Sequence, residues 1–380
     1  MLISRRSAVE PFHAMDVLAE ANRLSALGKP VISMAVGQPS DPAPKPVLEA
    51  ARKALEGGRL GYTNALGLDT LRNRIARFYL EHYHVEVDPA RVAVTTGSSS
   101  GFNLAFLAMF DAGDRVAITR PGYPAYRNIM TALGIEVVEI PVGPGEGGLT
   151  GARLEEIHCA RPLKGLLFAS PANPTGAAMA ADDMKALVLT AESLGISVIS
   201  DEIYHRLSHV GPDVTALSFS SNLAVINSFS KYYCMTGWRI GWMVLPQALV
   251  RPVERIAQSL YISPPELSQI AAVEAFSGTE ELEAVKARYS ESRLLLMDRL
   301  PRLGLDLAAP MDGAFYAWCD VTNHSKDSMA FARAMLAETF VAATPGLDFD
   351  PVHGRRFMRF SYAGKPNDIS EALDRLEKWL

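Results

Sequence analysis

Residues 166–204 read LLFASPANPTGAAMAADDMKALVLTAESLGISVISDEIY, a stretch in which two short apolar runs enclose a segment with helical periodicity. The runs Leu166–Ala169 and Ile196–Ser200 predict strands, and Met184–Leu194 predicts the helix between them. A strand–helix–strand order of this kind is typical of a parallel sheet whose two faces are both buried. The stretch therefore predicts an α/β fold.

The same alternation continues on both sides of this stretch. A second helical segment, Phe102–Phe110, also lies between two apolar runs. In total, five more runs predict strands: Val92–Thr95, Val116–Thr119, Ile135–Ile140, Ala224–Ser228 and Ile240–Leu245. Together with Leu166–Ala169 and Ile196–Ser200, they predict a large domain with a mostly parallel seven-stranded sheet between helices. The seven runs are numbered below in chain order, from Val92–Thr95 as the first.

The two ends of the chain lack this alternation. The N-terminal end contains one helical stretch, His13–Leu27, and the C-terminal end begins with a charged helical pattern, Glu280–Leu300, before a mixed tail. We expect residues 1–44 to form an N-terminal arm and part of a small domain, 45–284 the large domain, and 285–380 the rest of the small domain. The small domain would then be an α+β unit formed by both chain ends.

The composition is that of an ordinary globular protein, since 48% of the residues are hydrophobic and 21% are charged. The net charge is −5 without a basic block, so neither nucleic acid nor membrane is an expected partner. Cys159, Cys234 and Cys319 have no CxxC spacing, which argues against disulfides and a zinc site. We recognise no signal peptide and no bilayer-spanning run, and we expect a cytoplasmic protein without a bound metal.

A lysine follows the sixth apolar run, in Asn227-Ser228-Phe229-Ser230-Lys231. Lysine forms a Schiff base with an aldehyde cofactor where burial or a nearby cation lowers its pKa. Arg239 comes eight residues later and carries a guanidinium suited to a phosphate. Taken alone, Lys231 and Arg239 are better explained as ordinary solvated charges, because such short motifs recur by chance.

Asp201 and Tyr204 directly follow the fifth run. An aspartate at a buried strand end can pair with a protonated pyridine nitrogen, and the hydroxyl of Tyr204 can donate to a phenolate oxygen of the same ring. Asp201 is also consistent with a helix N-cap after a strand. On these residues alone, both interpretations remain open.

Three other runs end in further polar or aromatic residues. Asn173 lies in the turn after the fourth run, and Tyr123 follows the second run, where its ring can stack on a flat heterocycle. Gly97, Ser98 and Ser99 lie between the first run and a helix, where backbone amides and hydroxyls can bind a phosphate. Because ligands of such sheets bind beyond the carboxyl ends of the strands, these signals together predict one cofactor site.

On these residues the sequence resembles the class I and II aminotransferases, pyridoxal-phosphate enzymes of fold type I, over nearly its whole length. The resemblance implies that Lys231 holds pyridoxal phosphate as an internal aldimine and that Asp201 contacts the pyridine nitrogen. It also implies that Tyr204 and Asn173 bind the ring oxygen and that Tyr123 stacks on the ring. The phosphate contacts that it implies come from Gly97, Ser98, Ser99, Ser228, Ser230 and Arg239.

The resemblance extends to residues outside these motifs. Tyr62 matches a tyrosine that reaches the phosphate of the neighbouring subunit, which implies a homodimer with shared active sites. Arg359 matches the arginine that binds the substrate's α-carboxylate, although Arg355 and Arg356 lie close by in the sequence. Gly37 matches a small-domain glycine that closes over the substrate.

The reaction implied is transfer of an amino group between an L-amino acid and a 2-oxo acid, in a ping-pong cycle through the Lys231 aldimine and pyridoxamine phosphate. In that cycle Lys231 is the general base, and Asp201 and Tyr204 complete the catalytic set. A C–S β-lyase or a related synthase of the same fold type remains an alternative, because it shares these residues. A cofactor-binding regulatory module is a weaker alternative, since we expect no DNA-binding domain before the small-domain segment.

The identity of the substrate stays open, because apolar, aromatic and acidic amino acids all fit these motifs. Candidate residues for the wall of the substrate pocket are Phe12, Leu18, Tyr261 and the neighbouring subunit's Asn64.

Overall fold

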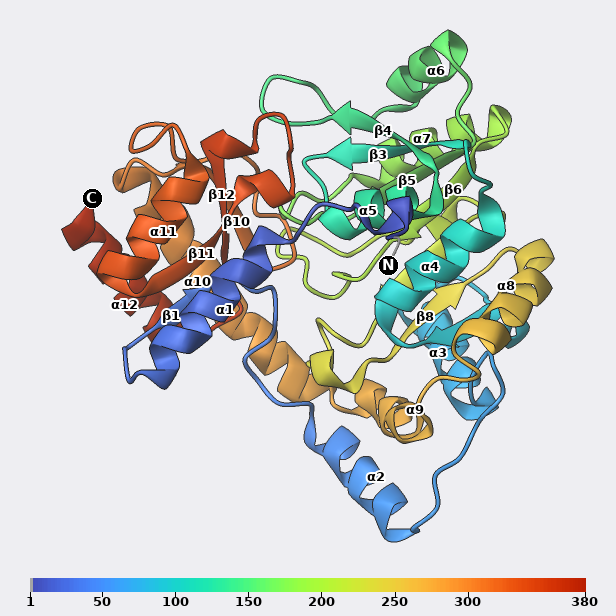
Figure 1. Cartoon of the computed structure of the whole chain (residues 1–380). Helices are drawn as coiled ribbons and strands as arrows, with labels where there is room; N and C mark the ends of the chain where they lie inside the picture. The colour runs from blue at the N-terminus through green and yellow to red at the C-terminus, as the bar shows by residue number, and fades with distance from the viewer. Residues whose placement is uncertain (1–2) are drawn as a thin grey trace.

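The computed structural model describes residues 3–380, which form two sheets with helices around each (Figure 1). The larger sheet has seven strands in the order β2-β8-β7-β6-β5-β3-β4. All its neighbouring strands are parallel except β8, which is antiparallel to β7 and β2. The strands are β2 (Val92–Thr95), β3 (Arg115–Arg120), β4 (Glu136–Pro141), β5 (Gly165–Ala169), β6 (Ser197–Asp201), β7 (Ala224–Ser228) and β8 (Gly241–Val244). The predicted fold class is therefore confirmed, and every predicted strand end falls within one residue of the observed end.

The carboxyl ends of the central strands lie level with one another. Ala169 at the end of β5 is opposite Asp201 at the end of β6, and Asp201 is opposite Ile226 near the end of β7. Because β8 returns antiparallel beside β7, the connection at residues 229–240 stays at this same edge of the sheet. The topology thus gathers three chain segments with polar side chains at one edge.

Successive residues of the strands face two separate hydrophobic clusters, as the period of two in a strand requires. Ile199 and Ile226 face one cluster, whereas Val198 and Val225 face the other. The helices that cover the first face are α4 (Gly97–Met109), α5 (Pro124–Leu133) and α8 (Gln247–Leu260). The helices on the second face are α3 (Asp69–Tyr83), α6 (Gly151–Ala160), α7 (Ala181–Ser193) and α9 (Glu266–Val273). A fully buried aliphatic side chain stabilises such a core by about 1.5–3 kcal/mol.

The second sheet joins the two ends of the chain. Its order is β1-β11-β12-β10-β9, with β1 parallel to β11 and the other pairs antiparallel. Its strands are β1 (Ile32–Met34), β9 (Asp306–Leu307), β10 (Tyr316–Asp320), β11 (Val341–Pro345) and β12 (Phe357–Ser361). Its helices are α1 (His13–Ala26), α10 (Thr279–Arg302), α11 (Ser328–Thr339) and α12 (Pro366–Trp379). Figure 1 accordingly draws α1 and β1, in blue, beside the red C-terminal elements.

The remaining helices lie in the connections. Helix α2 (Lys45–Glu56) packs against α9 at the lower end of Figure 1. The short 3₁₀ helices are η1 (Arg5–Ser7), η2 (Pro89–Arg91), η3 (Ala216–Ser218), η4 (Thr236–Trp238), η5 (Glu274–Ser277), η6 (Gly346–Asp348) and η7 (Gly354–Arg356). The expected domain boundaries after residues 44 and 284 stay a prediction, and residues 1–2 of the expected arm lie outside the described part of the chain. Among residues 3–380, no helix combines the length and the apolar character that a bilayer crossing requires.

Candidate active site

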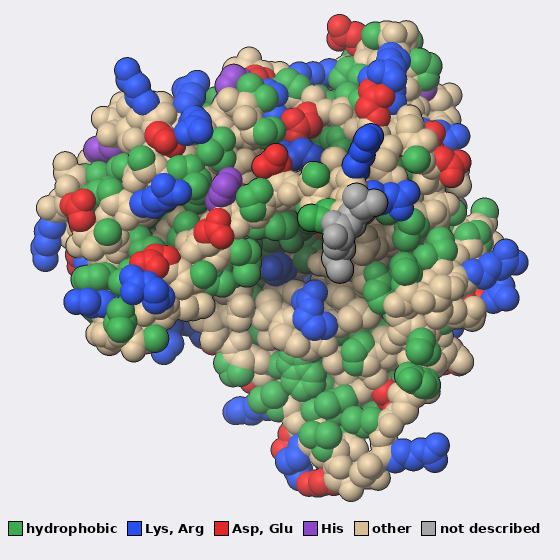
Figure 2. Space-filling model, in the orientation of Figure 1, with side chains coloured by type: hydrophobic (Ala, Val, Ile, Leu, Met, Phe, Trp, Pro, Cys, Tyr) green, Lys and Arg blue, Asp and Glu red, His purple; other side chains and the backbone are tan. Residues whose placement is uncertain are grey.

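A cavity of about 310 Å³ lies where the carboxyl edge of the large sheet meets the small sheet. Figure 2 shows the surface hollowed near the middle of one face, with Lys or Arg atoms inside the hollow. Most of the residues predicted for the site line this cavity: Gly37, Ser98, Ser99, Tyr123, Asn173, Asp201, Tyr204, Ser230, Lys231, Arg239 and Arg359. Three predicted residues do not line it, namely Gly97, Ser228 and Tyr62.

Lys231 lies in the connection between β7 and β8, and its side chain reaches across to the N-terminal segment. Its Nζ donates a hydrogen bond to the carbonyl of Gly37 at 2.6 Å and lies 5.9 Å from the centre of the Tyr204 ring. Burial, together with the positive charges of Arg359 and Arg239, lowers the pKa of Lys231 to about 8, although Asp201 opposes the shift. The amine therefore loses its proton far more readily than an ordinary lysine does.

Asp201 is the last residue of β6, and its carboxylate is buried. One oxygen accepts a hydrogen bond from the hydroxyl of Tyr126, and the other accepts from the amide of Ile203 at 3.0 Å. Burial raises the pKa of Asp201 to about 6, while these two hydrogen bonds limit the rise. The carboxylate is thus ionised at neutral pH inside a largely apolar wall. No regular helix begins at Asp201, so the N-cap interpretation does not hold.

Tyr126 is a site residue that the sequence motifs did not predict, although its spacing from Tyr123 was a signal. It lies in the first turn of α5, three residues after Tyr123, which directly precedes the helix. The two ring centres are 5.4 Å apart, and both rings line the cavity. The hydroxyl of Tyr126 thus helps to fix the position of the Asp201 carboxylate.

Tyr316, on β10, is a second residue that the sequence did not indicate. Its hydroxyl forms a hydrogen bond of 2.7 Å with the hydroxyl of Tyr204. It also explains the glycine at position 37, because a Cβ atom there would lie 1.7 Å from the Tyr316 oxygen. No other residue fits at Gly37 without displacing Tyr316.

The phosphate-binding residues predicted from the sequence lie around the N-terminus of α4. Gly97 has a φ of +75°, and a Cβ at this position would lie 2.6 Å from Nη2 of Arg239. The guanidinium therefore lies directly against the first turn of α4, whose amides are free to bind an anion. Ser98, Ser99 and Ser230 face the same space. Ser228 is buried behind them and donates a hydrogen bond to Ser230 at 2.9 Å.

Arg359, on β12, is at the opposite end of the cavity. Its Nη1 donates to Oδ1 of Asn173 at 2.8 Å, and its Nη2 donates to the carbonyl of Ala35 at 2.6 Å. Its guanidinium lies 4.3 Å from the Tyr316 ring centre and 4.6 Å from that of Phe349. Nε of Arg359 is buried without a protein hydrogen-bond partner, which is unusual for a guanidinium and favours a ligand.

The neighbouring arginines pair elsewhere. Arg355 forms an ion pair with Asp327 at 3.0 Å, and Arg356 forms one with Asp320 at 2.9 Å. Neither lines the cavity, so Arg359 alone of the three is available to bind an anion there.

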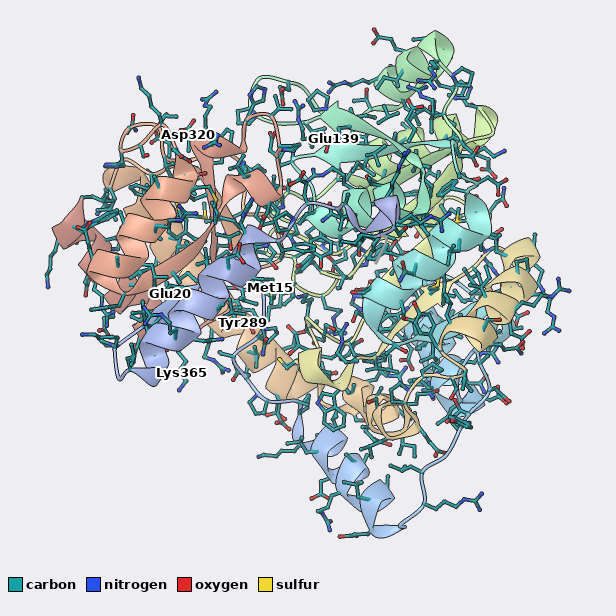
Figure 3. The ribbon with its side chains drawn as sticks, in the orientation of Figure 1. Met15, Glu20, Glu139, Tyr289, Asp320 and Lys365 are labelled. Atoms are coloured by element: carbon teal, nitrogen blue, oxygen red, sulfur yellow. The ribbon has the colours of Figure 1, made fainter. Side chains whose placement is uncertain are left out.

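The side wall next to Arg359 comes from the N-terminal segment and from the loop after β11. Phe12 lines it as expected, 6.3 Å from Tyr123 between ring centres, and it is joined by Met15, Val36 and Phe349. Figure 3 labels Met15 at the end of α1 that faces the middle of the molecule. Leu18 and Tyr261 do not line the cavity.

Tyr62 lies outside the cavity, and the residue is 82% exposed. Among residues 3–380, no group of three or more His, Cys, Asp or Glu side chains is arranged to hold a metal ion.

Comparisons with known proteins show the family to which the chain belongs. A family model described as aminotransferase class I and II matches residues 29–376. The sequence is 48% identical to the valine–pyruvate aminotransferase of Mycobacterium tuberculosis, with 100% of this chain and 98% of that protein covered. It is 34% identical to the (5-formylfuran-3-yl)methyl phosphate transaminase of Methanocaldococcus jannaschii, with 100% of both covered. A crystal structure of an aminotransferase from Mycobacterium tuberculosis matches with a TM-score of 0.97 at 47% identity, covering 100% of this chain and 99% of that one.

Proposed function

The chain belongs to the class I and II aminotransferases, and from this premise we propose that its cavity binds pyridoxal phosphate through Lys231 and accepts L-amino acids with apolar side chains. Enzymes of this family pass an amino group from an L-amino acid to a 2-oxo acid in two successive half-reactions. The observation that carries the proposal is the half-buried Lys231, whose amine has a lowered pKa and which shares one cavity with Asp201, Arg239 and Arg359.

The residues present fit this cofactor at both of its ends. The guanidinium of Arg239 and the free amides of α4 come together around Gly97, as a phosphate requires. Asp201 offers an ionised carboxylate for a pyridinium nitrogen. The residues that would hold the cofactor are Gly97, Ser98, Ser99, Ser228, Ser230 and Arg239 at the phosphate, Tyr123 at the ring face, Asp201 at the nitrogen, and Asn173 and Tyr204 at the ring oxygen.

When bound, the cofactor supplies a conjugated ring that accepts the electron pair left at the substrate's α-carbon. Asp201, with its pKa of about 6, holds a proton at the pyridine nitrogen. Lys231 Nζ, with its pKa of about 8, removes the proton from Cα as a general base. Arg359 binds the α-carboxylate and thereby sets the direction of the Cα–H bond.

The proposed preference for apolar side chains rests on the wall beside Arg359. Phe12, Met15, Val36 and Phe349 form that wall, and the cations that line the cavity are Lys231, Arg239 and Arg359. Each of these cations already has a partner in the proposed complex, so this chain leaves none for a side-chain carboxylate. The relative named valine–pyruvate aminotransferase supports valine as an amino donor and pyruvate as an acceptor.

We also propose that two copies of the chain form a homodimer in which Tyr62 contacts the phosphate bound by the partner. The support is that Tyr62 projects from the surface, outside the cavity of its own chain. Exposed leucines lie near it in the sequence, Leu55 and Leu60. A sedimentation measurement of the loaded protein, with Tyr62→Phe tested for weaker cofactor binding, checks this arrangement.

The function is tested by mixing the protein, loaded with pyridoxal phosphate, with L-valine and no 2-oxo acid. We expect about one 2-oxo acid to form per bound cofactor and the absorbance of the aldehyde form to disappear. Pyruvate should then restore that absorbance and release alanine. Continuous formation of 2-oxo acid and ammonia without pyruvate would refute transamination, and failure to bind the cofactor would refute the whole proposal.

A further inference from the structure

Asp348 ends the helix η6, directly after β11, and lies in the wall of the cavity with only 3% of its surface exposed. Its two carboxylate oxygens accept hydrogen bonds from backbone amides of α1, from His13 at 2.8 Å and from Ala14 at 2.7 Å. Phe12, the residue before α1, has no side-chain group that could bind these amides. Asp348 therefore caps α1 from a position more than 300 residues away in the sequence.

This cap determines where the apolar wall lies. Phe12 and Met15 flank the two amides that Asp348 binds, and both side chains line the cavity. The segment before them is held by Asn128, whose side-chain amide donates to the carbonyl of Glu10 at 2.9 Å. The start of α1 is thus fixed by two hydrogen-bonding side chains, one from Asp348 and one from Asn128.

The carboxylate also brings a negative charge to the cavity. Asp201 and Asp348 are its only charged groups of this sign among the lining residues, and Asp201 serves the cofactor end. Burial raises the pKa of Asp348, whereas the two amides, His13 and the positive charge of Arg359 favour the ionised form. The wall that meets the substrate's side chain therefore combines apolar groups with a fixed carboxylate.

We propose that Asp348 determines specificity, because it anchors α1 over the substrate's side chain and its carboxylate disfavours substrates with a second carboxylate. A side-chain carboxylate beside Phe12 and Phe349 would lose water next to a like charge, with no free cation of this chain to pair with. This inference rests on the proposed function, since it concerns the choice among amino donors.

The test compares L-glutamate with L-valine as amino donors to pyruvate in the Asp348→Asn variant. Asparagine keeps the size and one hydrogen-bond acceptor for α1 but removes the charge. We expect the ratio of kcat/KM for glutamate to that for valine to rise about 10-fold or more, chiefly through a lower KM for glutamate. Asp350→Asn is the matched control, because Asp350 is equally buried, lies two residues away and does not line the cavity. Its ratio should stay at the value of the unaltered protein.

A ratio that does not change in Asp348→Asn would overturn the inference and leave Asp348 as an anchor of α1 alone. If that variant does not fold, the inference is tested on the unaltered holoenzyme by measuring competitive inhibition of the reaction with valine. Isovalerate should then bind at least about 10-fold more tightly than glutarate, and equal binding would overturn the inference. If L-valine fails to react with the unaltered protein, the proposed function has failed; if valine reacts and only the glutamate results disagree, this inference alone has failed.

Discussion

The two ends of the cavity are built in different ways. The end that contains Lys231, Asp201 and Arg239 comes from connections at one edge of the seven-stranded sheet. The end that contains Arg359 and Phe12 comes from opposite ends of the chain, joined by contacts such as that between Asp348 and His13. The first end repeats the usual location of ligand sites in parallel sheets, whereas the second depends on how this particular chain folds back on itself. We infer that the first end carries the chemistry of the family and the second carries the choice of substrate.

The largest expected effect follows from removing the amine at the first end. Lys231→Ala should lower kcat by at least about 10⁴-fold, because it removes both the proposed attachment point of the cofactor and the general base. Steady-state rates with L-valine and pyruvate measure this loss. Lys164→Ala, which changes a surface lysine, is the control. Turnover by Lys231→Ala above about one part in a hundred would contradict the assigned role.

A change at the second end should act on binding more than on chemistry. Arg359→Gln removes a buried guanidinium that we expect to pair with the α-carboxylate, so kcat/KM should fall about 10²- to 10³-fold, mostly through KM. Arg355→Gln is the matched control, since Arg355 pairs with Asp327 at the surface and should change kcat/KM less than about twofold. Equal losses in the two variants would erase the distinction between the two ends.

Removing the hydrogen bond from Tyr126 tests how this end of the cavity sets the pKa of Asp201. This bond lowers the pKa of Asp201, so Tyr126→Phe should raise that pKa above about 6. The acid limb of the kcat profile should then move to higher pH by about 0.5–1 unit. Tyr233→Phe is the control, because the buried Tyr233 hydroxyl has no hydrogen-bond partner among the described residues and lies outside the cavity. An acid limb that stays in place would show that another group controls it.

The smallest expected effect concerns stability without cofactor. Asp201 has its pKa raised from 3.8 to about 6, so the folded state binds this proton more tightly than the unfolded state does. The contribution of this proton to the free energy of unfolding is therefore lost as pH rises from about 4 to 6, and the loss is complete above that range. Asp201→Asn should recover about 1–3 kcal/mol at pH 8 and almost nothing at pH 4. Urea unfolding at the two pH values measures the difference, and a gain of equal size at both would show that titration of Asp201 is not its cause.

The contrast between the two ends also explains what the sequence could predict. The seven strands and the residues that follow them were predictable, because apolar runs mark buried strands and parallel strands end at a common edge. Arg359 was recognised only through the resemblance to a family. Tyr316 and Asp348 were not recognised at all, because their roles arise from contacts with Tyr204 and with the amides of α1 that no local pattern encodes.

Tyr62 lies outside the cavity of its own chain, and its role is a second feature that the sequence alone does not establish. A single sequence does not indicate which surface meets a second copy, and the role of Tyr62 stays a proposal that depends on a dimer.

The most direct test of the central claim is to locate the cofactor on the chain. The protein loaded with pyridoxal phosphate would be reduced with borohydride and digested, and the modified peptide would be identified by mass spectrometry. We expect the added mass on the peptide that contains Lys231, in an amount close to one per chain, and its loss when L-valine is added before reduction. Modification of another lysine in preference to Lys231, or no modification at all, would contradict the role of Lys231 as the attachment point.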